Sequence, residues 1–571
     1  MGDVLQYLID GASGIVTGGV DGKALVAGVC SRGQVGKGYL VGKRTDLEAL
    51  LGQGPLVERV RDILNTGGQE PFVVAVPVQG QPGGYISAPV HQGGGASAQV
   101  EGYPARNADV VARVAEGGAI GTATLEISAD GGKTWASASA TAAQIPVASG
   151  EQPTGATLVF AADAVLEKGA SYAFSVRCPV GPVYTIGDAK SPALEIAELA
   201  GGVLTGAELV IQVMRGGGRN TGTFRLSTDG GDNYGKARTI PVNGVHDLPD
   251  FGVTITFPEG EYPAGTTYTC RLLPPAPSIV DVLEALETPL NLFDVEFVHI
   301  VGDSDSVDWL AAQAKAEELW NCQRPTYFKL EARLPRDGED MSAYAAALLA
   351  ERQGVACRFV TVCCQYGELV DSTGAVRLRN AGGLQSGRVM SIPVQRAAGR
   401  VKDGPVSQLV LPDGWSAIQT ALEDAGYLTA KKYAGVAGAY WGDSRTLADA
   451  TSDYRYEEVL RTVFKAIRLT RVAALKSMYD EAGDPLRPES DNGLAYLKAN
   501  LENALDVMVK AKELAAYVVN IPAGQDITNN GVAVEVTLIG IPIIREIKLY
   551  NRYVYAGSRF DPRMEEMEEA A

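Results

Sequence analysis

Residues 532–560 read VAVEVTLIGIPIIREIKLYNRYVYAGSRF, two extended runs that are separated by Gly540 and Pro542. In the first run apolar side chains alternate with other residues, which predicts a strand with one apolar face. That face comprises Val532, Val534, Val536 and Leu538. The second run, Ile544–Tyr555, is about twice the usual strand length, and the acidic tail Met564–Ala571 comes after it. A long apolar strand with an unpaired edge recruits another chain, so we expect this run to be an arm that joins neighbouring molecules.

The composition is that of a globular protein with an acidic surface. The chain has 571 residues, of which 46% are hydrophobic and 21% charged, and its formal net charge is −18. This length predicts roughly two to four domains, and the negative charge argues against a nucleic-acid partner. No apolar run approaches the roughly 18 residues that span a bilayer, and Met1–Asp10 lacks the pattern of a secretory signal. We therefore expect no direct membrane insertion.

Strands alternate with helices on both sides of a long β-rich interruption. Before it, the pattern predicts a helix over Thr45–Leu64 and a buried strand over Phe72–Val78. After it, the predicted strands are Val295–Val301, Pro325–Ala332 and Cys357–Cys364, and the predicted helices are Ser306–Trp320, Met341–Gln353, Trp415–Ala425, Tyr456–Met478 and Asn492–Leu514. Alternation of this kind predicts βαβ units and a mostly parallel sheet.

The interruption is an internal repeat. Val111–Trp135 and Val210–Tyr234 correspond at an offset of 99, with SADGGKTW in the first copy against STDGGDNY in the second. Asp-Gly-Gly between alternating runs is a strong hairpin signal, so each copy is predicted to be a small antiparallel β-sandwich. The two sandwiches interrupt the α/β unit, and their ends are expected to meet near Gln79–His91 and Pro274–Ser278.

The first copy of the repeated octapeptide, Ser128–Trp135, resembles the Asp box of sialidase-like propellers, Ser-x-Asp-x-Gly-x-Thr-Trp. In those proteins the Asp and Gly hold a turn while the Trp packs beneath it. A glycosidase would also need a pair of carboxylates or a Tyr nucleophile in a cleft, and no such pair is evident. We favour a structural hairpin over a sugar-contacting loop.

The predicted fold class is an α/β (α+β) core with a mixed sheet and extended terminal β arms, plus two inserted immunoglobulin-like antiparallel β-sandwich domains. The predicted division is 1–88 for the first part of the core with an N-terminal arm, 89–183 and 184–276 for the two sandwiches, 277–400 for the second α/β part of the core, 401–543 for the C-terminal core and 544–571 for the C-terminal arm.

The motifs that carry chemistry are missing. The three histidines, His91, His246 and His299, show no metal-binding spacing, and His299 is expected to be a satisfied core residue. Gly33–Gly38 lacks the Gly-Lys-Ser/Thr ending of a phosphate loop, and no Gly-x-Ser-x-Gly elbow occurs. The seven cysteines fit neither a disulfide framework nor a zinc site. We therefore predict no enzyme, no catalytic, cofactor-binding or metal-binding residues, and no cofactor.

One basic stripe remains. Arg461, Lys465 and Arg468 lie at i, i+4 and i+7 on the predicted helix Tyr456–Met478 and share one side of it. They are either a solvated face or an interface stripe that answers acidic neighbours. The preceding turn, Trp441–Thr446, is expected to form a buried structural network in which Asp443 or Ser444 caps the next element.

The C-terminal half resembles the tail sheath proteins of contractile phages and of phage-tail-like bacteriocins (tailocins). Leu422–Leu428, LEDAGYL, is similar to a turn of that family, and Tyr440–Thr446, YWGDSRT, is similar to its Trp-Gly-x-Arg-Thr segment with one extra residue. The family order of helix, helix, strand and terminal arm matches Tyr456–Met478, Asn492–Leu514, Tyr517–Asn520 and Val532–Leu549, and Gly38–Leu51 is similar to sheath starts. The likeness covers about 1–80 and 280–560. Arg377–Val401 departs from it, which indicates a divergent subfamily.

The resemblance implies a structural subunit of a virion tail, or of a bacteriocin particle, assembled in the bacterial host cytoplasm. Such subunits polymerise as stacked hexameric rings, a helical polymer around an inner tail tube, and their contraction drives the tube through a cell envelope. The implied partners are copies of the chain itself, the inner tail tube protein, and baseplate and tail terminator proteins. Arms near Asp3–Val16 and Ile544–Phe560 would complete β-sheets in neighbouring subunits. The implied arm contacts are Ile544, Ile547, Leu549, Tyr553 and Tyr555, and the interface or tube-facing candidates are Arg461, Lys465 and Arg468.

Two other functions stay open on the sequence. The paired sandwiches could make the chain a glycan-binding surface protein, although the missing secretory signal argues against this. An unrecognised hydrolase is a weaker alternative, because the histidines are scattered and no nucleophile motif is present.

Overall fold

The computed structural model describes residues 20–188, 190–370, 374–406, 409–486 and 493–556, together with residues 558, 560, 561 and 563. The N-terminal arm predicted over Asp3–Val16 and the acidic tail Met564–Ala571 lie outside the described residues. None of the helices in the described part of the chain combines the length and the hydropathy needed to span a bilayer.

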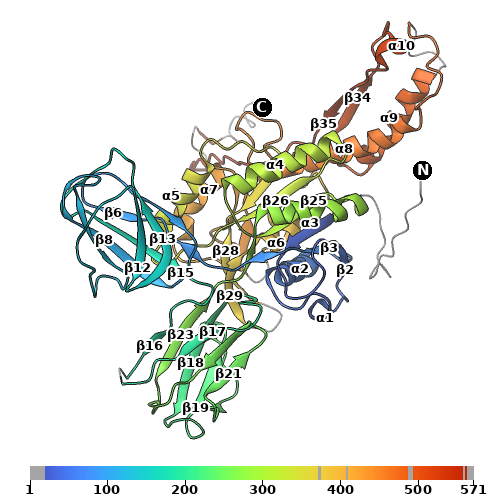
Figure 1. Ribbon diagram of the computed structural model, residues 1–571. Helices are drawn as coiled ribbons and strands as arrows, with labels where there is room; N and C mark the ends of the chain where they lie inside the picture. The colour runs from blue at the N-terminus through green and yellow to red at the C-terminus, as the bar shows by residue number, and fades with distance from the viewer. Residues whose placement is uncertain are drawn as a thin grey trace, which may run out of the picture.

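A seven-stranded sheet forms the centre of the chain (Figure 1). Its strands, in the order in which they pair, are β2 (Tyr39–Val41), β3 (Phe72–Pro77), β1 (Lys23–Gly28), β25 (Phe297–Ser304), β26 (Tyr327–Ala332), β27 (Val360–Cys363) and β31 (Tyr427–Leu428). All neighbours pair in parallel except β2, which runs antiparallel to β3. The mostly parallel sheet predicted from the alternation of strands and helices is therefore confirmed, with one antiparallel strand at its edge.

Helices cover both faces of this sheet. They are α1 (Leu47–Leu51), α2 (Pro55–Thr66), α3 (Ile279–Leu292), α4 (Ser306–Asn321), α5 (Met341–Arg352), α6 (Gly382–Met390) and α7 (Trp415–Asp424). On β1, Leu25 packs in the apolar cluster that contains α3 and α4, while the next residue, Val26, packs with α1 and α2. Because neighbouring side chains on a strand point to opposite faces, the sheet is buried on both sides, as parallel sheets usually are.

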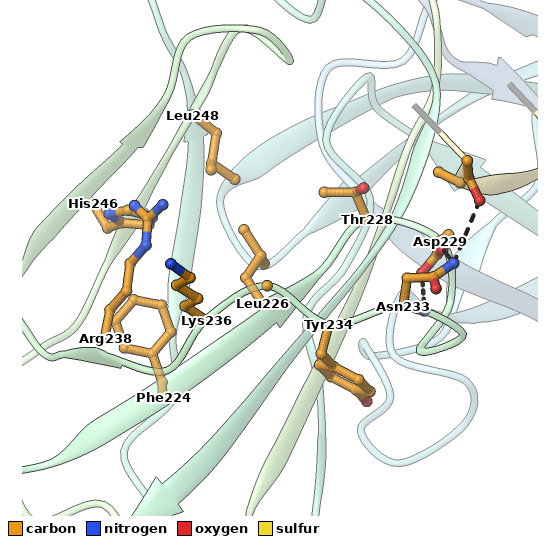
Figure 2. Close-up of a pocket in the computed structure, with 13 residues that line it drawn as sticks. Phe224, Leu226, Thr228, Asp229, Asn233, Tyr234, Lys236, Arg238, His246 and Leu248 are labelled. Carbon is orange, nitrogen blue, oxygen red and sulfur yellow. Dashed lines mark hydrogen bonds between the residues drawn. The ribbon is translucent and has the colours of Figure 1, made fainter. Parts of the chain in front are cut away.

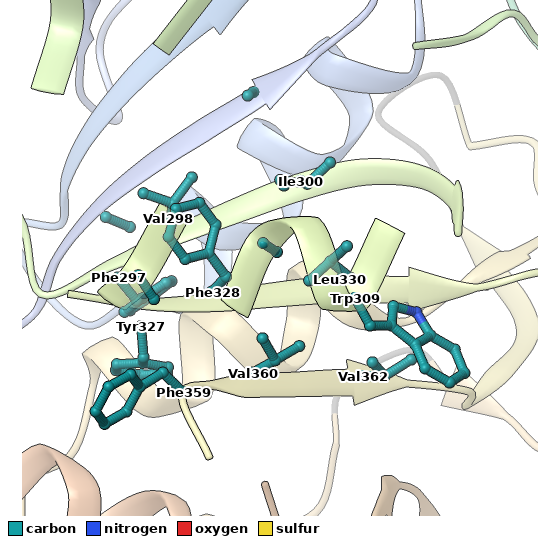
Figure 3. Packing of buried hydrophobic residues seen from close by; sticks show 14 of the residues in the cluster. Phe297, Val298, Ile300, Trp309, Tyr327, Phe328, Leu330, Phe359, Val360 and Val362 are labelled. Atoms are coloured by element: carbon teal, nitrogen blue, oxygen red, sulfur yellow. The ribbon is translucent and has the colours of Figure 1, made fainter. Parts of the chain in front are cut away.

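The two faces of β25 and β26 differ in chemistry. Toward α4 these strands present apolar side chains, which pack with Trp309 in one buried cluster (Figure 3). Toward α2 and α6 they present His299, Lys329 and Glu331, each at most 3% exposed. The second face is therefore a buried polar layer.

Among the described residues, four ion pairs between acidic side chains and Arg or Lys are buried in the core. They are Arg59–Glu331, Arg379–Asp62, Lys329–Glu457 and Arg461–Glu296. Glu331 accepts a hydrogen bond from Nε of Arg59 at 2.6 Å, and Nε2 of His299 lies 3.1 Å from the same carboxylate. Burial opposes the ionisation of Glu331, but Arg59 and His299 lower its pKa to about 2. His299 also contacts Ser386 at 2.8 Å, so it is the satisfied core residue that the sequence predicts.

The two ends of the β-rich insertion meet. Strand β4 (Gly80–Gln81) pairs antiparallel with β24 (Ala276–Pro277), so the chain leaves and rejoins the core at one place, as predicted. Between them lie two separate lobes, teal and green in Figure 1. Each lobe has its own hydrophobic cluster, which its antiparallel sheets enclose. An immunoglobulin-like topology for these lobes remains a prediction.

The strands of the first lobe are β5 (Tyr85–Ile86), β6 (Val90–Gln92), β7 (Gln99–Gly102), β8 (Ala108–Glu116), β9 (Gly118–Ala119), β10 (Thr124–Ser128), β11 (Ser139–Ala140), β12 (Gln144–Ser149), β13 (Gln152–Val159), β14 (Val165–Leu166) and β15 (Ser171–Arg177). Those of the second are β16 (Tyr184–Ile186), β17 (Glu195–Glu198), β18 (Ala207–Arg215), β19 (Thr223–Ser227), β20 (Arg238–Thr239), β21 (Val245–Leu248), β22 (Val253–Thr256) and β23 (Thr267–Leu272). The offset of 99 residues superposes β8 on β18 and β10 on β19, so the internal repeat is a structural repeat.

The repeated octapeptide forms a turn that satisfies itself. In the first lobe Asp130 accepts hydrogen bonds from the hydroxyl of Ser128 at 2.7 Å and from the backbone N–H of Thr134 at 2.9 Å. In the second lobe Asp229 accepts them from Ser227 at 2.5 Å and from the N–H of Asn233 at 2.9 Å. Each carboxylate is therefore occupied by its own turn, as the predicted structural hairpin requires.

The C-terminal part of the chain adds small sheets and a projecting unit. The small sheets contain β28 (Tyr366–Val370), β29 (Val376–Asn380), β30 (Leu409–Val410), β32 (Ala430–Lys432) and β33 (Ala439–Trp441), and a 3-10 turn covers Val401–Asp403. The projecting unit contains α8 (Glu457–Leu475), α9 (Gly493–Lys510), β34 (Ala516–Asn520), α10 (Ile527–Asn530) and β35 (Glu535–Ile539). The first half of α8 packs on the core through Leu460 and Phe464, and the rest of the unit extends away from the central sheet, in orange and red in Figure 1. A cluster of its own, which includes Leu501, Leu505 and Met508, holds it together.

Candidate functional site

The segment after β35 is extended and exposed. Residues 540–555 pair with no strand of the described chain. The side chains of Ile544, Leu549 and Tyr553 are 79%, 78% and 83% exposed, and Ile547 and Tyr555 are similarly open. The predicted second strand is thus not a strand within its own chain, because it has no partner there to complete a ladder. We keep the name arm for residues 540–555.

One ion-pair cluster holds the root of the arm. Nε of Arg545 lies 3.1 Å from both carboxylate oxygens of Asp443, and the guanidinium also pairs with Glu458. Its central carbon lies 3.6 Å from the centre of the Tyr456 ring, within the range of a cation–π contact. Tyr456 and Glu458 are at the start of α8. Arg545 therefore fixes where the arm leaves the folded chain.

Glu458 is an unusual partner for this arginine. It is 3% exposed, and one of its two carboxylate oxygens has no hydrogen-bond partner among the described residues. Burial raises the pKa of Glu458 to about 7, although the charge of Arg545 opposes the shift. Because the folded chain holds this proton more tightly than an unfolded chain does, Glu458 stabilises the fold fully below pH 4.5, and the contribution is lost as the pH rises through about 7.

Glu458→Gln is expected to remove this pH dependence. Between pH 4.5 and 7 the free energy of unfolding of the native chain should fall by up to about 3 kcal/mol more than that of the variant. Urea denaturation across this window measures the difference. Glu481→Gln, at an exposed carboxylate beyond α8, is the control and should keep the native slope. Equal slopes for native chain and Glu458→Gln would contradict the buried, raised pKa.

The projecting unit offers a sheet that can accept a strand. β34 and β35 form a two-stranded antiparallel sheet whose outer edges are unpaired within the described chain. One face packs in a cluster with α9 through Tyr517, Val519 and Leu538. Of the apolar face predicted for the first run, Val534 and Leu538 join this cluster, whereas Val536 is 38% exposed. On the other face Val518 and Ile539 are 53% and 44% exposed. A two-stranded sheet is only marginally stable alone, so this one has both the edges and the apolar surface for further strands.

The predicted basic stripe is placed differently from the sequence interpretation. Arg461 is 2% exposed and pairs with Glu296 at 2.5 Å. Arg468 donates to the backbone oxygens of Val295 and Pro325. Lys465 pairs with Asp21 and Glu513 at 2.6 and 2.7 Å. The helix packs this side against the chain itself, so these residues form internal contacts and not a solvated face or an exposed interface stripe.

The turn Trp441–Thr446 is a buried network, as the sequence predicts, but neither Asp443 nor Ser444 caps the next helix, because α8 follows Tyr456 without a side-chain cap. Ser444 and Thr446 are buried, and Arg445 pairs with Asp424 at 3.2 Å. Asp443, expected only to cap the next element, instead binds the arm through Arg545. The sequence signal that could have found this contact is the single arginine in the apolar run IPIIREI. No pattern in the sequence pairs that arginine with Asp443.

Metal-binding groups and hollows were the remaining kinds of site to consider in the described part of the chain. It contains no group of three or more His, Cys, Asp or Glu side chains arranged to hold a metal ion. Two hollows of about 470 and 450 Å³ are associated with the inserted lobes. His91 stacks on Tyr172, with ring centroids 4.7 Å apart, and His246 lines the first hollow.

Comparison with known proteins gives two family matches. Residues 1–445 match the family described as DUF2586, N-terminal domain, and residues 453–558 match the one described as DUF2586, C-terminal domain. No curated protein sequence matches the chain.

The solved structures that are similar to this one include two sheath tail proteins and a baseplate chain. The sheath tail protein from Desulfitobacterium hafniense is 11% identical with a TM-score of 0.41, covering 95% of this chain and 100% of that one. The sheath tail protein from Listeria innocua is 10% identical with a TM-score of 0.39, covering 93% and 97%. A chain of the anti-feeding prophage baseplate is 18% identical with a TM-score of 0.36, covering 50% and 76%.

Proposed function

The chain belongs to the DUF2586 family, and we propose that it is a structural, non-enzymatic subunit of a contractile tail sheath. The observation that carries the proposal is the arm: an extended, largely apolar segment that is rooted by Arg545 and unpaired within the described chain. Contiguous exposed apolar side chains on a folded protein mark an interaction surface, and unpaired extended backbone binds by adding a strand to a sheet.

The edges of β34–β35 in a second copy are the partner that fits this arm. They supply unpaired backbone groups beside the exposed side chains of Val518 and Ile539. Each backbone hydrogen bond across such a junction contributes about 1 kcal/mol. Several such bonds, together with the side chains of Ile547 and Leu549 that the neighbouring subunit would cover, hold two subunits. Ile544, Tyr553 and Tyr555 extend the same contact.

This contact propagates because it is heterologous. The donated arm and the accepting sheet are different surfaces, so each subunit both gives and receives, and such contacts build rings or open helices instead of closed dimers. Rings of six, stacked around an inner tail tube and attached to baseplate and terminator proteins, are the assembly that we propose. Contraction is then a rigid-body change between two packings of the subunits, with the arms keeping neighbours linked.

Negative-stain electron microscopy of the purified full-length chain tests the proposal. Rings or tubes of uniform diameter are expected, at concentrations where light scattering reports a mass far above 60.0 kDa. A preparation that stays at the mass of one chain over the whole accessible concentration range would refute self-assembly.

A further inference from the structure

The second inserted lobe has a hollow at the open edge between its two sheets. It has a volume of about 470 Å³, within the range of small-molecule sites. Phe224 and Leu226 of β19 line it from one sheet, and His246 and Leu248 of β21 line it from the other (Figure 2). Each pair is spaced by two residues, so both members point to the same side. The hollow therefore has an apolar floor that both sheets build.

Its rim carries positive charge. Lys236 and Arg238 are exposed and line the hollow, and no salt bridge ties either of them to a carboxylate within the described residues. Arg238 lies opposite Phe224 in the strand register. Asp229 also lines the hollow, but its oxygens accept from Ser227 and Asn233. The rim thus offers two cations in a chain whose net charge is −18.

His246 adds a neutral hydrogen-bonding group beside the cations. Its ring meets that of Phe224 edge to face, with centroids 5.4 Å apart. Burial, and then the charge of Arg238, lower the pKa of His246. A neutral imidazole has one donor and one acceptor nitrogen, which suits a ligand with hydroxyl groups.

The first lobe lacks this combination. By the offset of 99, Ser137 and Ser139 stand where Lys236 and Arg238 stand in the second lobe. By strand register, Ile145 takes the place of His246: Ile145 pairs with Leu158, as His246 pairs with Ile255. The repeat therefore maintains the fold in both lobes, while the cations and the imidazole belong to the second lobe alone.

We propose that this hollow binds a saccharide that carries an acidic group. A carboxylate or phosphate would sit between Lys236 and Arg238, because charge-assisted hydrogen bonds are the strongest that such a rim can make. The sugar ring would lie on Leu226 and Leu248, and His246 would meet its hydroxyl groups. This site does not depend on the arm or on assembly into a sheath.

Saturation-transfer NMR on the full-length chain tests the site with glucuronate and glucose 6-phosphate as acidic probes and glucose as the neutral one. Saturable binding of at least one acidic sugar is expected, at least about tenfold tighter than that of glucose. The two acidic probes separate a carboxylate ligand from a phosphate ligand. Acetate and inorganic phosphate, added as competitors at equal concentration, should displace little of the signal.

The decisive variant gives the second lobe the residues of the first. Lys236→Ser with Arg238→Ser should weaken binding of the acidic sugar about tenfold or more, with an unchanged melting temperature because both side chains are exposed. Lys133→Ser with Lys168→Ser removes two exposed cations from the first lobe and should leave the affinity unchanged. Equal loss in both variants, equal binding of glucose, displacement by bare anions, or no binding of either acidic sugar would overturn the proposal. If the Lys236→Ser, Arg238→Ser variant still forms tubes, its loss of sugar binding does not result from a loss of assembly.

Discussion

Removal of residues 544–571 is expected to leave a folded chain that no longer assembles into rings or tubes. Most described side chains of the deleted segment are exposed and none belongs to a strand, so the fold should persist. The melting temperature should nevertheless fall, because Glu458 is buried and loses its contact with Arg545. Assembly should be lost altogether, because every contact between subunits that we propose uses this arm. Electron microscopy and light scattering measure the assembly, and circular dichroism measures the fold.

Two matched variants locate the effect within the arm. Ile547→Asp with Leu549→Asp should abolish assembly as completely as the deletion, since it places charges in a strand that must be buried by the neighbour. Truncation of residues 564–571 alone should leave assembly intact. Tubes formed by the chain without residues 544–571 would contradict the role of the arm. If removal of residues 564–571 alone abolished the tubes, the contact between subunits would lie in the acidic tail and not in the arm.

Arg461→Met is expected to destabilise the core by about 3–5 kcal/mol. The substitution leaves Glu296 buried without its partner; both side chains are at most 2% exposed, and the pair distance is 2.5 Å. An uncompensated buried charge is costly because it has lost its hydration and its counter-charge together. Differential scanning calorimetry should show the transition of the core at a lower temperature.

Arg471→Met is the control, since Arg471 is exposed on the same helix, and its effect should stay within about 0.5 kcal/mol. If Arg461→Met instead left the melting temperature unchanged and only prevented assembly, the side chain would act at an interface between subunits and not in the core.

The βαβ core, the repeat and the point of insertion could all be predicted from sequence, because they depend on patterns that are local. Alternation of strands with helices fixed the parallel sheet, and the shared Asp-Gly-Gly turns fixed the two lobes. The arm could also be predicted from the sequence, since Ile544–Tyr555 is too long and too apolar for an ordinary closing strand.

The buried charges could not be predicted, because their partners are distant in sequence. Tyr327–Ala332 reads YFKLEA, and nothing in this pattern shows what would neutralise Lys329 and Glu331 if the strand were buried on both faces. In the structure Arg59 of α2 covers Glu331 and Glu457 of α8 covers Lys329. For the same reason the sequence could not show that Arg461 is buried, because its partner Glu296 lies 165 residues away. Nor could it show the contact of Arg545 with Asp443.

The short ribbon of Gly80–Gln81 against Ala276–Pro277 has a consequence for how such a chain can change. Because both crossings lie side by side, the chain re-enters the core where it left it, and each doubling of a connecting segment costs only about 0.6 kcal/mol in closure entropy. The lobes also contact the core directly, as Arg177 does through Asp337 at 2.7 Å. Other domains could therefore be inserted at this ribbon in place of the lobes, while the central sheet keeps its register.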